Sequence, residues 1–216
     1  MNRYVVFFDL DHTLLNTSSG RLFVKYLFHN NLIGWEQLLQ GLFVGFFHRF
    51  GLINAEKIIT RWAMKCKGLS EKNMIEFSQK WFKDDVINYF RGYVVEEMNN
   101  HKKREGRVVI LSAATPYICN PIKEYLEMDY VISTELEVMD GLFTGKLLGN
   151  FCYGMGKLKK AIEYCNSNGF EMEKAFYYAD SFADIPVLER VGNPVCISPD
   201  KGLRKEAMKR GWQIIS

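Results

Sequence analysis

The chain has 216 residues, of which 48% are hydrophobic and 25% charged, and its formal net charge is +3. This length can bury a core in one large domain or in a core with an inserted subdomain, and the composition excludes a largely disordered chain. Basic residues are spread along the sequence, which argues against a dedicated nucleic-acid binder. The five cysteines and four histidines show no metal-ligand spacing. We therefore expect reduced, structural thiols and neither a zinc site nor a Cys/His dyad.

The first predicted element is a buried strand over residues 4–8, which ends in Asp9-Leu10-Asp11-His12-Thr13. Side chains alternate along a strand, so Asp9 and Asp11 would begin on the same side if the chain stayed extended. Ligands bind at this end of the strands in open α/β sheets. Two carboxylates so close imply a metal, a proton-transfer pair, or both. The alternative is one acid that caps the next helix beside a solvated neighbour, and the pair alone leaves both open.

Residues 16–85 are predicted to form an all-helical insertion. Apolar residues recur at spacings of three and four over 22–27 and 38–47, and further helices are expected over 54–65 and 70–82. No strand-like alternation interrupts them. The stretch 38–50 is rich in large apolar side chains, but its polar and charged neighbours leave far fewer than the ~20 apolar residues that a transmembrane span requires.

From residue 86 onward, helices and strands are predicted to alternate. A helix is expected over 86–105, and a buried strand over 107–111 ends in Ser112. A short third strand covers 130–132, and Asp140-Gly141 predicts a β-hairpin between 136–139 and 142–146. The remaining elements are a helix over 156–167 and strands over 175–179, 194–197 and 212–215. This order predicts an α/β fold with a doubly wound, mostly parallel, Rossmann-like sheet.

Residues suited to phosphate chemistry stand at the ends of these elements. Asp9, Asp11, Ser112, Asp180 and Asp184 follow strands, and Lys157 begins a helix after two glycines. Several carboxylates in one crevice require a divalent cation, and oxygen ligands without His or Cys favour Mg²⁺. A lysine and a hydroxyl beside that metal would bind a phosphoryl group. Taken singly, these residues would be helix caps, first-turn acids or a solvated lysine, so only their joint order indicates a site.

In this order and spacing, the residues resemble the motifs of the haloacid dehalogenase-like (HAD) hydrolases. The similarity is to subfamily IB, the phosphoserine-phosphatase-like branch with a helical C1 cap. Residues 9–13 stand at its DxDxT loop, Ser112 at its second motif, Lys157 at its third, and residues 180–184 at its acidic fourth. The resemblance implies a Rossmann-like core formed by residues 1–15 and 86–216, with residues 16–85 as the cap.

The resemblance also implies a role for each motif residue. Asp9 would be the nucleophile that forms an aspartyl-phosphate, and Asp11 the general acid and then the base. Mg²⁺ would be held by Asp9, Asp180 and the backbone carbonyl of Asp11, and Asp184 would support the metal. The groups expected to bind the phosphoryl oxygens are those of Thr13, Ser112 and Lys157.

Two departures from the family bear on the substrate. Residues 16–20 contain no acid to meet a substrate ammonium, and Ala183 stands where phosphoserine phosphatases have Asn. Ser18 in this stretch and Arg61 in the cap are candidates for substrate recognition, although a solvated helix arginine is the favoured interpretation of Arg61. The apolar stretch 38–50 could serve cap packing, a hydrophobic phosphoester, a dimer contact or peripheral contact with a membrane surface.

The sequence therefore predicts a Mg²⁺-dependent phosphomonoester hydrolase that acts on a small phosphorylated metabolite. Alternatives are a phosphoserine phosphatase proper, or a histidinol-phosphate or lipid-phosphate phosphatase. A receiver domain phosphorylated on Asp and an interaction module that uses the aromatic cap are the alternatives that are not enzymes. We expect a cytoplasmic protein, because no signal-peptide pattern precedes the first strand, and we expect no nucleic-acid partner. The oligomeric state stays open.

Overall fold

A six-stranded parallel sheet forms the centre of the computed structural model, which describes residues 4–31, 34 and 55–216. The strand order is β3-β2-β1-β6-β7-β8, and every neighbouring pair is parallel. The strands are β1 (Val5–Phe8), β2 (Arg107–Leu111), β3 (Tyr130–Ile132), β6 (Phe176–Ala179), β7 (Asn193–Ile197) and β8 (Gln213–Ile215). The predicted mostly parallel sheet is confirmed, and β1 lies between β2 and β6.

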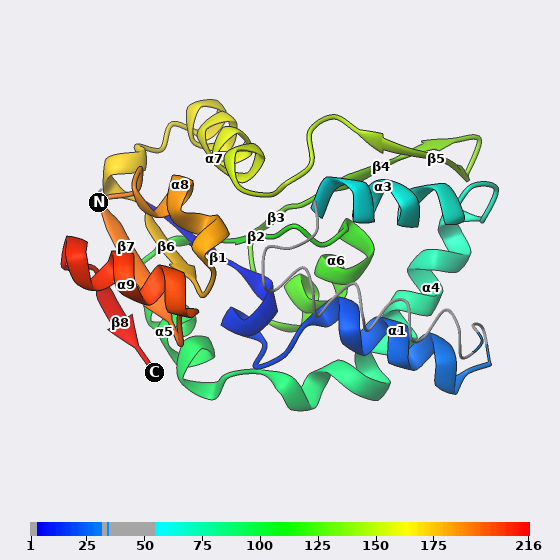
Figure 1. The fold of residues 1–216 in the computed structure, drawn as a ribbon, viewed down its shortest axis with the longest axis horizontal. Coiled ribbons are helices and arrows are strands. Elements are labelled where there is room, and N and C mark those ends of the chain that lie inside the picture. Colours follow the sequence, from blue (N-terminus) through cyan, green and yellow to red (C-terminus); the bar gives the residue numbers. More distant parts are fainter. Residues whose placement is uncertain (1–3, 32–33, 35–54) are drawn as a thin grey trace.

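Helices cover both faces of this sheet (Figure 1). Val6 and Phe8 pack in a core with α5 (Gly92–Lys103) and α6 (Pro116–Tyr125), whereas Val5 and Phe7 pack in a second core with helices of the other face. Those helices are α7 (Met155–Asn168), α8 (Ile185–Leu188) and α9 (Lys201–Arg210). This alternation of buried side chains is what a strand covered on both faces requires, and it confirms the doubly wound fold.

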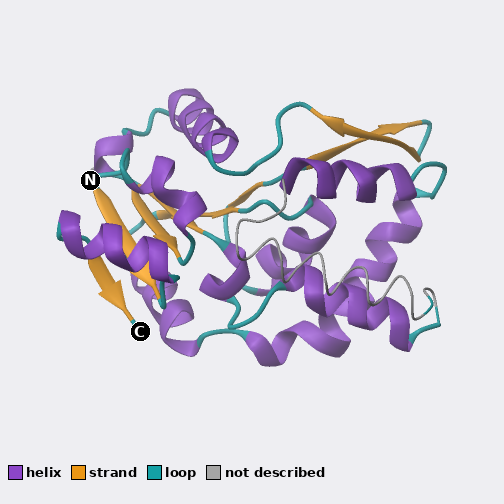
Figure 2. Ribbon diagram, viewed as in Figure 1, coloured by secondary structure: helices purple, strands orange, loops and turns teal. Residues whose placement is uncertain are grey.

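The remaining helices and a hairpin gather beside the sheet, on the right of Figures 1 and 2. The helices are α1 (Ser19–His29), α3 (Ala55–Lys65) and α4 (Glu71–Trp81), and the hairpin strands are β4 (Glu135–Met139) and β5 (Leu142–Leu148). Aromatic rings join α1 to α4, since Phe23 packs edge-on against Phe77 and Trp81. The apolar stretch 38–50 lies outside the described residues. None of the helices in the described part combines the length and hydrophobicity that a membrane span needs.

The predicted helix over 86–105 is not continuous: a 3₁₀ turn covers Ile87–Tyr89, the backbone is extended at Phe90 and Arg91, and α5 begins only at Gly92. Residues before it pair with the segment that follows the first strand. The amide of Asn16 donates to the carbonyl of Tyr89, that of Arg91 donates to Leu14, and Leu15 and Phe90 form an antiparallel bridge. The two connections between the sheet and the inserted helices therefore run side by side. All five cysteines are free and buried, as expected.

Candidate active site

Three neighbouring strands deliver polar residues to one edge of the sheet. Asp9 follows β1, Ser112 follows β2 and Asp180 follows β6. Because β1 lies between the other two strands and all three are parallel, their carboxyl ends meet at the same edge. All three residues are buried, with Asp9 only 6% exposed. The fold thus brings Asp9 to the same edge as two residues that lie more than 100 positions further along the chain.

An acidic cluster, formed by Asp9, Asp180 and Asp184, lies at this edge. Each residue offers a carboxylate oxygen, and these oxygens lie within 4.8 Å of one another. Asp184 comes from the short helical turn Phe182–Asp184, directly after the loop that leaves β6, and is 3% exposed. Buried carboxylates at this separation repel one another unless positive charge lies between them.

Lys157 supplies one positive charge to the acidic cluster. Its Nζ donates to Asp9 Oδ1 at 2.7 Å, to Asp184 Oδ1 at 2.7 Å and to the hydroxyl of Tyr177 at 2.9 Å. The lysine lies in the first turn of α7 and is 3% exposed, so it is not the solvated helix residue that its sequence position alone would indicate. The preceding position in this first turn requires glycine, because a Cβ at Gly156 would overlap the carbonyl oxygen of Phe151.

One lysine does not neutralise three acids, and the pKa values of Asp9 and Asp180 are raised. Burial raises the pKa of Asp9 to about 7, although Lys157 opposes the shift. Burial also raises the pKa of Asp180 to about 9, and the charges of Asp9 and Asp184 add to the effect. Among the described residues, none donates a hydrogen bond to the carboxylate of Asp180. The acidic cluster is therefore short of positive charge, which makes it a candidate site for a divalent cation.

The carboxylate of Asp11 has different neighbours from that of Asp9. His12 adopts a left-handed conformation with φ of 56°, so the extended backbone does not continue through the loop. The Oδ1 atom of Asp11 accepts from the backbone N–H of Ser19 at 2.8 Å, and Oδ2 accepts from the hydroxyl of Ser18 at 3.2 Å. Asp11 thus caps the first turn of α1, and its carboxylate does not belong to the acidic cluster.

The two predicted phosphate-binding hydroxyls are both buried. Thr13 is 0% exposed, and its Oγ1 has no hydrogen-bond partner among the described residues. Ser112 is 2% exposed, and its Oγ accepts from the amide of Ala114 at 3.1 Å. A buried hydroxyl without a hydrogen-bond partner is unfavourable, and a ligand oxygen bound beside Thr13 would supply that partner.

The two candidates for substrate recognition are placed differently. Ser18 contacts Asp11 and so belongs to the neighbourhood of the DxDxT loop. Arg61 is exposed on α3, and within the described residues no contact joins it to the acidic cluster. Tyr177 is the residue that the sequence analysis missed. Its only signal is its place on β6 three residues before Asp180, which puts its side chain on the sheet face that α7 covers.

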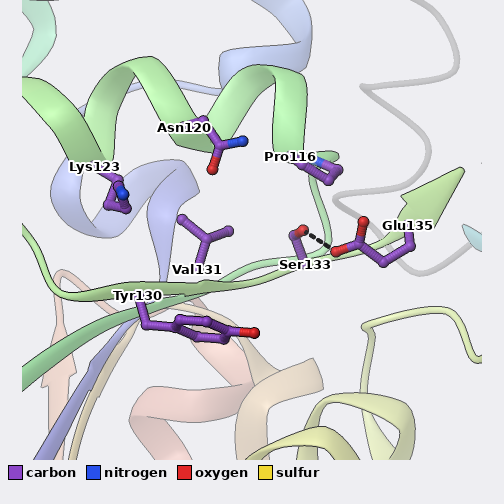
Figure 3. A pocket seen from close by; sticks show the side chains of 7 residues that line it. All are labelled: Pro116, Asn120, Lys123, Tyr130, Val131, Ser133 and Glu135. Atoms are coloured by element: carbon purple, nitrogen blue, oxygen red, sulfur yellow. Dashed lines mark hydrogen bonds between the residues drawn. The ribbon is translucent and has the colours of Figure 1, made fainter. Parts of the chain in front are cut away.

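A separate hollow of about 280 Å³ lies between α6 and β3 (Figure 3). Its lining includes Asn120 and Lys123 from the helix and Tyr130 from the strand, and Ser133 donates a hydrogen bond to Glu135 at its rim. It contains none of the residues of the acidic cluster. The hollow is thus distinct from the edge of the sheet where the chemistry-bearing residues meet.

A parallel α/β sheet with buried acids and a lysine at its carboxyl edge, beside inserted helices, defines the class of hydrolase that the motifs predicted. Residues 6–189 match the family of haloacid dehalogenase-like hydrolases. The chain belongs to this family.

Relatives match over almost the whole chain. A protein of Mycobacterium tuberculosis (strain ATCC 25618 / H37Rv) named a probable phosphatase is 32% identical over 99% of this chain and 75% of its own length. A phosphoserine phosphatase of the same strain is 30% identical over 96% and 69%. A histidinol-phosphatase of Neisseria meningitidis serogroup C (strain 8013) is 24% identical over 97% and 96%. These relatives confirm the predicted resemblance to the phosphoserine-phosphatase-like branch.

The fold is also that of a solved structure. A protein of unknown function from Bordetella pertussis Tohama I superimposes with a TM-score of 0.91 over 100% of this chain and 99% of its own, at 24% sequence identity. This similarity supports the arrangement of sheet and inserted helices.

Proposed function

We propose that the chain hydrolyses the phosphomonoester of a small phosphorylated metabolite through an aspartyl-phosphate on Asp9. The observation that carries this proposal is the meeting of three buried carboxylates, within 4.8 Å of one another, with a buried lysine at the edge of the sheet. Buried charges of one sign destabilise a fold, so such a cluster is retained at sites where it performs chemistry.

In the first step, a carboxylate oxygen of Asp9 would attack phosphorus in line, while the bond from phosphorus to the alcohol oxygen breaks. Asp11 would give a proton to the departing alcohol. In the second step it would take a proton from the water that attacks phosphorus, while the bond from phosphorus to the Asp9 oxygen breaks, so that inorganic phosphate leaves and the carboxylate of Asp9 is restored. Such proton transfers contribute roughly 10²–10⁴ in rate. The N–H of Ser19 and the hydroxyl of Ser18 hold the carboxylate of Asp11 near this loop.

The transferred group spreads negative charge over three oxygens, and this chain has three groups suited to bind them. Thr13 has a buried hydroxyl without a partner, Ser112 a buried hydroxyl, and Lys157 an ammonium already in contact with Asp9. We infer that these three groups orient the phosphoryl group on Asp9. The low-dielectric surroundings strengthen their electrostatic effect.

The acidic cluster fits Mg²⁺. Its donors are all carboxylate oxygens, its charge exceeds that of Lys157, and the carboxylate of Asp180 lacks a hydrogen-bond donor from the described residues. We propose that Asp9, Asp180 and the backbone carbonyl of Asp11 hold the ion and that Asp184 supports it. When bound, Mg²⁺ would neutralise the charge that develops on the transferring group.

We also propose that residues 16–85 form a cap over the core of residues 1–15 and 86–216. The two connections run side by side, with Leu15 and Phe90 in an antiparallel bridge, and this supports the division because both would move together in a hinge. Closure of the cap would exclude water while Asp9 is phosphorylated. The cytoplasmic location and the absence of a nucleic-acid partner stay predictions.

The test is turnover of p-nitrophenyl phosphate with Mg²⁺ by the wild type, Asp9→Asn and a matched control, Asp140→Asn. Asp140 lies in the hairpin turn with φ of 51°, which Asn also tolerates, so this control makes the same chemical change away from the site. We expect Asp9→Asn to lose turnover and Asp140→Asn to keep it. An Asp9→Asn enzyme as active as the wild type would overturn the mechanism.

The substrate is addressed by release of inorganic phosphate from a panel of metabolites. The panel contains phosphoserine, histidinol phosphate and lipid phosphates, because relatives are named for the first two and the apolar stretch 38–50 suggests the third. Residues 16–20 contain no acid for the ammonium of phosphoserine, so we expect phosphoserine to be hydrolysed less efficiently than the preferred substrate. Preference for phosphoserine over the other compounds would contradict this expectation.

A further inference from the structure

Tyr177 is a buried residue of the site to which the proposed mechanism assigns no role. It is 0% exposed and lies on β6, three residues before Asp180. Its hydroxyl donates to Asp184 Oδ1 at 2.7 Å and accepts from Lys157 Nζ at 2.9 Å. One hydroxyl therefore joins the lysine to an acid that the lysine also contacts directly.

These contacts use all the protons of the Lys157 ammonium. The group has three N–H donors, and its acceptors are Asp9 Oδ1, Asp184 Oδ1 and the hydroxyl of Tyr177. The nitrogen is tetrahedral, so once two protons are fixed the direction of the third is fixed as well. Asp184 and Tyr177 together therefore point the remaining N–H at Asp9.

A tyrosine suits this position because its hydroxyl accepts a hydrogen bond from the ammonium without adding charge. Burial raises the pKa of Tyr177 well above its usual value, which keeps the phenol neutral. A fourth carboxylate here would increase the excess of negative charge in the acidic cluster. The ring is packed in the core against α7, with its centroid 5.6 Å from Lys157 Nζ, so the hydroxyl is held in place by packing.

We propose that Tyr177 is a positioning residue, whose hydroxyl holds one proton of Lys157 so that the ammonium stays aimed at Asp9 and at the phosphoryl group that forms on it. The inference rests on the proposed phosphatase function, because only then does the direction of the ammonium matter for turnover. Without the hydroxyl, the ammonium loses one of three acceptors and is free to rotate toward Asp184.

The experiment compares Tyr177→Phe with the matched control Tyr178→Phe. Tyr178 is the next residue on β6, and its buried hydroxyl bonds to His101 on the opposite face of the sheet. Each variant removes one buried hydroxyl, so we expect similar decreases in melting temperature. With p-nitrophenyl phosphate and Mg²⁺, we expect Tyr177→Phe to lower kcat about tenfold with KM within about twofold, because an interaction that acts in the chemical step is lost. Tyr178→Phe should keep kcat within about twofold of the wild type.

A second readout does not depend on turnover. A buried ammonium with three acceptors exchanges its protons slowly, so Lys157 should give a ¹H–¹⁵N signal that Lys157→Met removes. We expect this signal in the wild type and in Tyr178→Phe, and its loss in Tyr177→Phe. If Tyr177→Phe does not fold, p-aminophenylalanine at position 177 replaces it in the test. Its amino group fills the same space and donates to Asp184, but it accepts poorly from Lys157. We therefore expect this variant to show both the lower kcat and the missing ammonium signal.

The outcomes separate this inference from the proposed function. If Asp9→Asn is inactive while Tyr177→Phe matches Tyr178→Phe in kcat and keeps the ammonium signal, the role of Tyr177 is overturned and the phosphatase mechanism stands. If Asp9→Asn is fully active, the mechanism itself fails. A tenfold loss in Tyr177→Phe together with loss of the ammonium signal supports the role.

Discussion

His101 offers a test of how the core beneath the site responds to pH. It lies on α5, is 4% exposed, and contacts two tyrosine hydroxyls: Tyr4 at 3.0 Å from Nδ1 and Tyr178 at 2.9 Å from Nε2. Its ring centroid is 4.7 Å from that of Phe176. Burial, helped by the nearby charge of Arg104, lowers the pKa of His101 to about 4.

The lowered pKa makes stability depend on pH in one direction. Below its ordinary pKa of 6.5, the unfolded chain binds a proton at this residue that the folded chain excludes until about pH 4. The free energy of unfolding therefore falls as pH decreases from 6.5 toward 4. The shift of about 2.5 units, from 6.5 to about 4, corresponds to at most about 3.4 kcal/mol at ~1.36 kcal/mol per unit. Between pH 7.5 and 5 the expected loss is about 2 kcal/mol.

The assay is urea unfolding of the wild type, His101→Gln and the control His29→Gln at pH 7.5 and 5. Glutamine does not titrate, so His101→Gln should lose about 2 kcal/mol less than the wild type between the two pH values. His29 is exposed at the end of α1, and its replacement should leave the full pH dependence. The reasoning is refuted if His101→Gln and the wild type lose the same free energy of unfolding, because the other titrating groups are common to both.

Two further predictions concern the site. Burial and the neighbouring acids raise the pKa of Asp180 to about 9, so at neutral pH this carboxyl must take up a proton on folding, which costs stability. Asp180→Asn removes that cost, so we expect a higher melting temperature without metal. It should also lose the stabilisation that Mg²⁺ gives the wild type when thermal unfolding is compared in Mg²⁺ and in EDTA, and equal stabilisation of both by Mg²⁺ would contradict the prediction. Gly156→Ala should displace Lys157, because its Cβ would overlap the carbonyl of Phe151, and lower turnover by about tenfold or more. Gly92→Ala, where a Cβ meets open space, is the control that should stay active, and equal activity of the two variants would count against the displacement.

Local patterns predicted the sheet and most helices correctly, whereas pairings between distant segments were not predictable. The apolar run before Asp9 and that before Ser112 are strands because each is buried on both faces, and such runs are visible in the sequence. The helix predicted over 86–105 is instead interrupted at Phe90 and Arg91, and α5 begins at Gly92. Residues there pair with Asn16 and its neighbours, more than 70 positions away, and no local pattern records that competition.

The same distinction applies to the site. The apolar runs before Asp9, Ser112 and Asp180 predicted that these residues follow strands, and parallel neighbouring strands deliver their carboxyl ends to one edge. The orientation of a neutral partner such as Tyr177 was not predictable, since an aromatic residue in a strand is most often simple core packing. Its role follows only from the hydroxyl distances to Lys157 and Asp184.

The sequence left two interpretations open for Asp9 and Asp11: a metal or proton-transfer site, or an acid that caps the next helix. In the structure, Asp9 has the position that the first predicts and Asp11 the position that the second predicts. Asp9 stays at the end of β1 and joins the acidic cluster, whereas the left-handed turn at His12 precedes a helix whose first turn Asp11 caps. That helix, α1, belongs to the inserted segment, so Asp11, the proposed acid and base, lies in the proposed core but has its carboxylate hydrogen-bonded to the proposed cap. Asp9, the proposed nucleophile, has no such bond to the cap among the described residues. A movement of α1 that keeps these hydrogen bonds would change the separation of the two carboxylates, and proton transfer would then depend on the position of the cap.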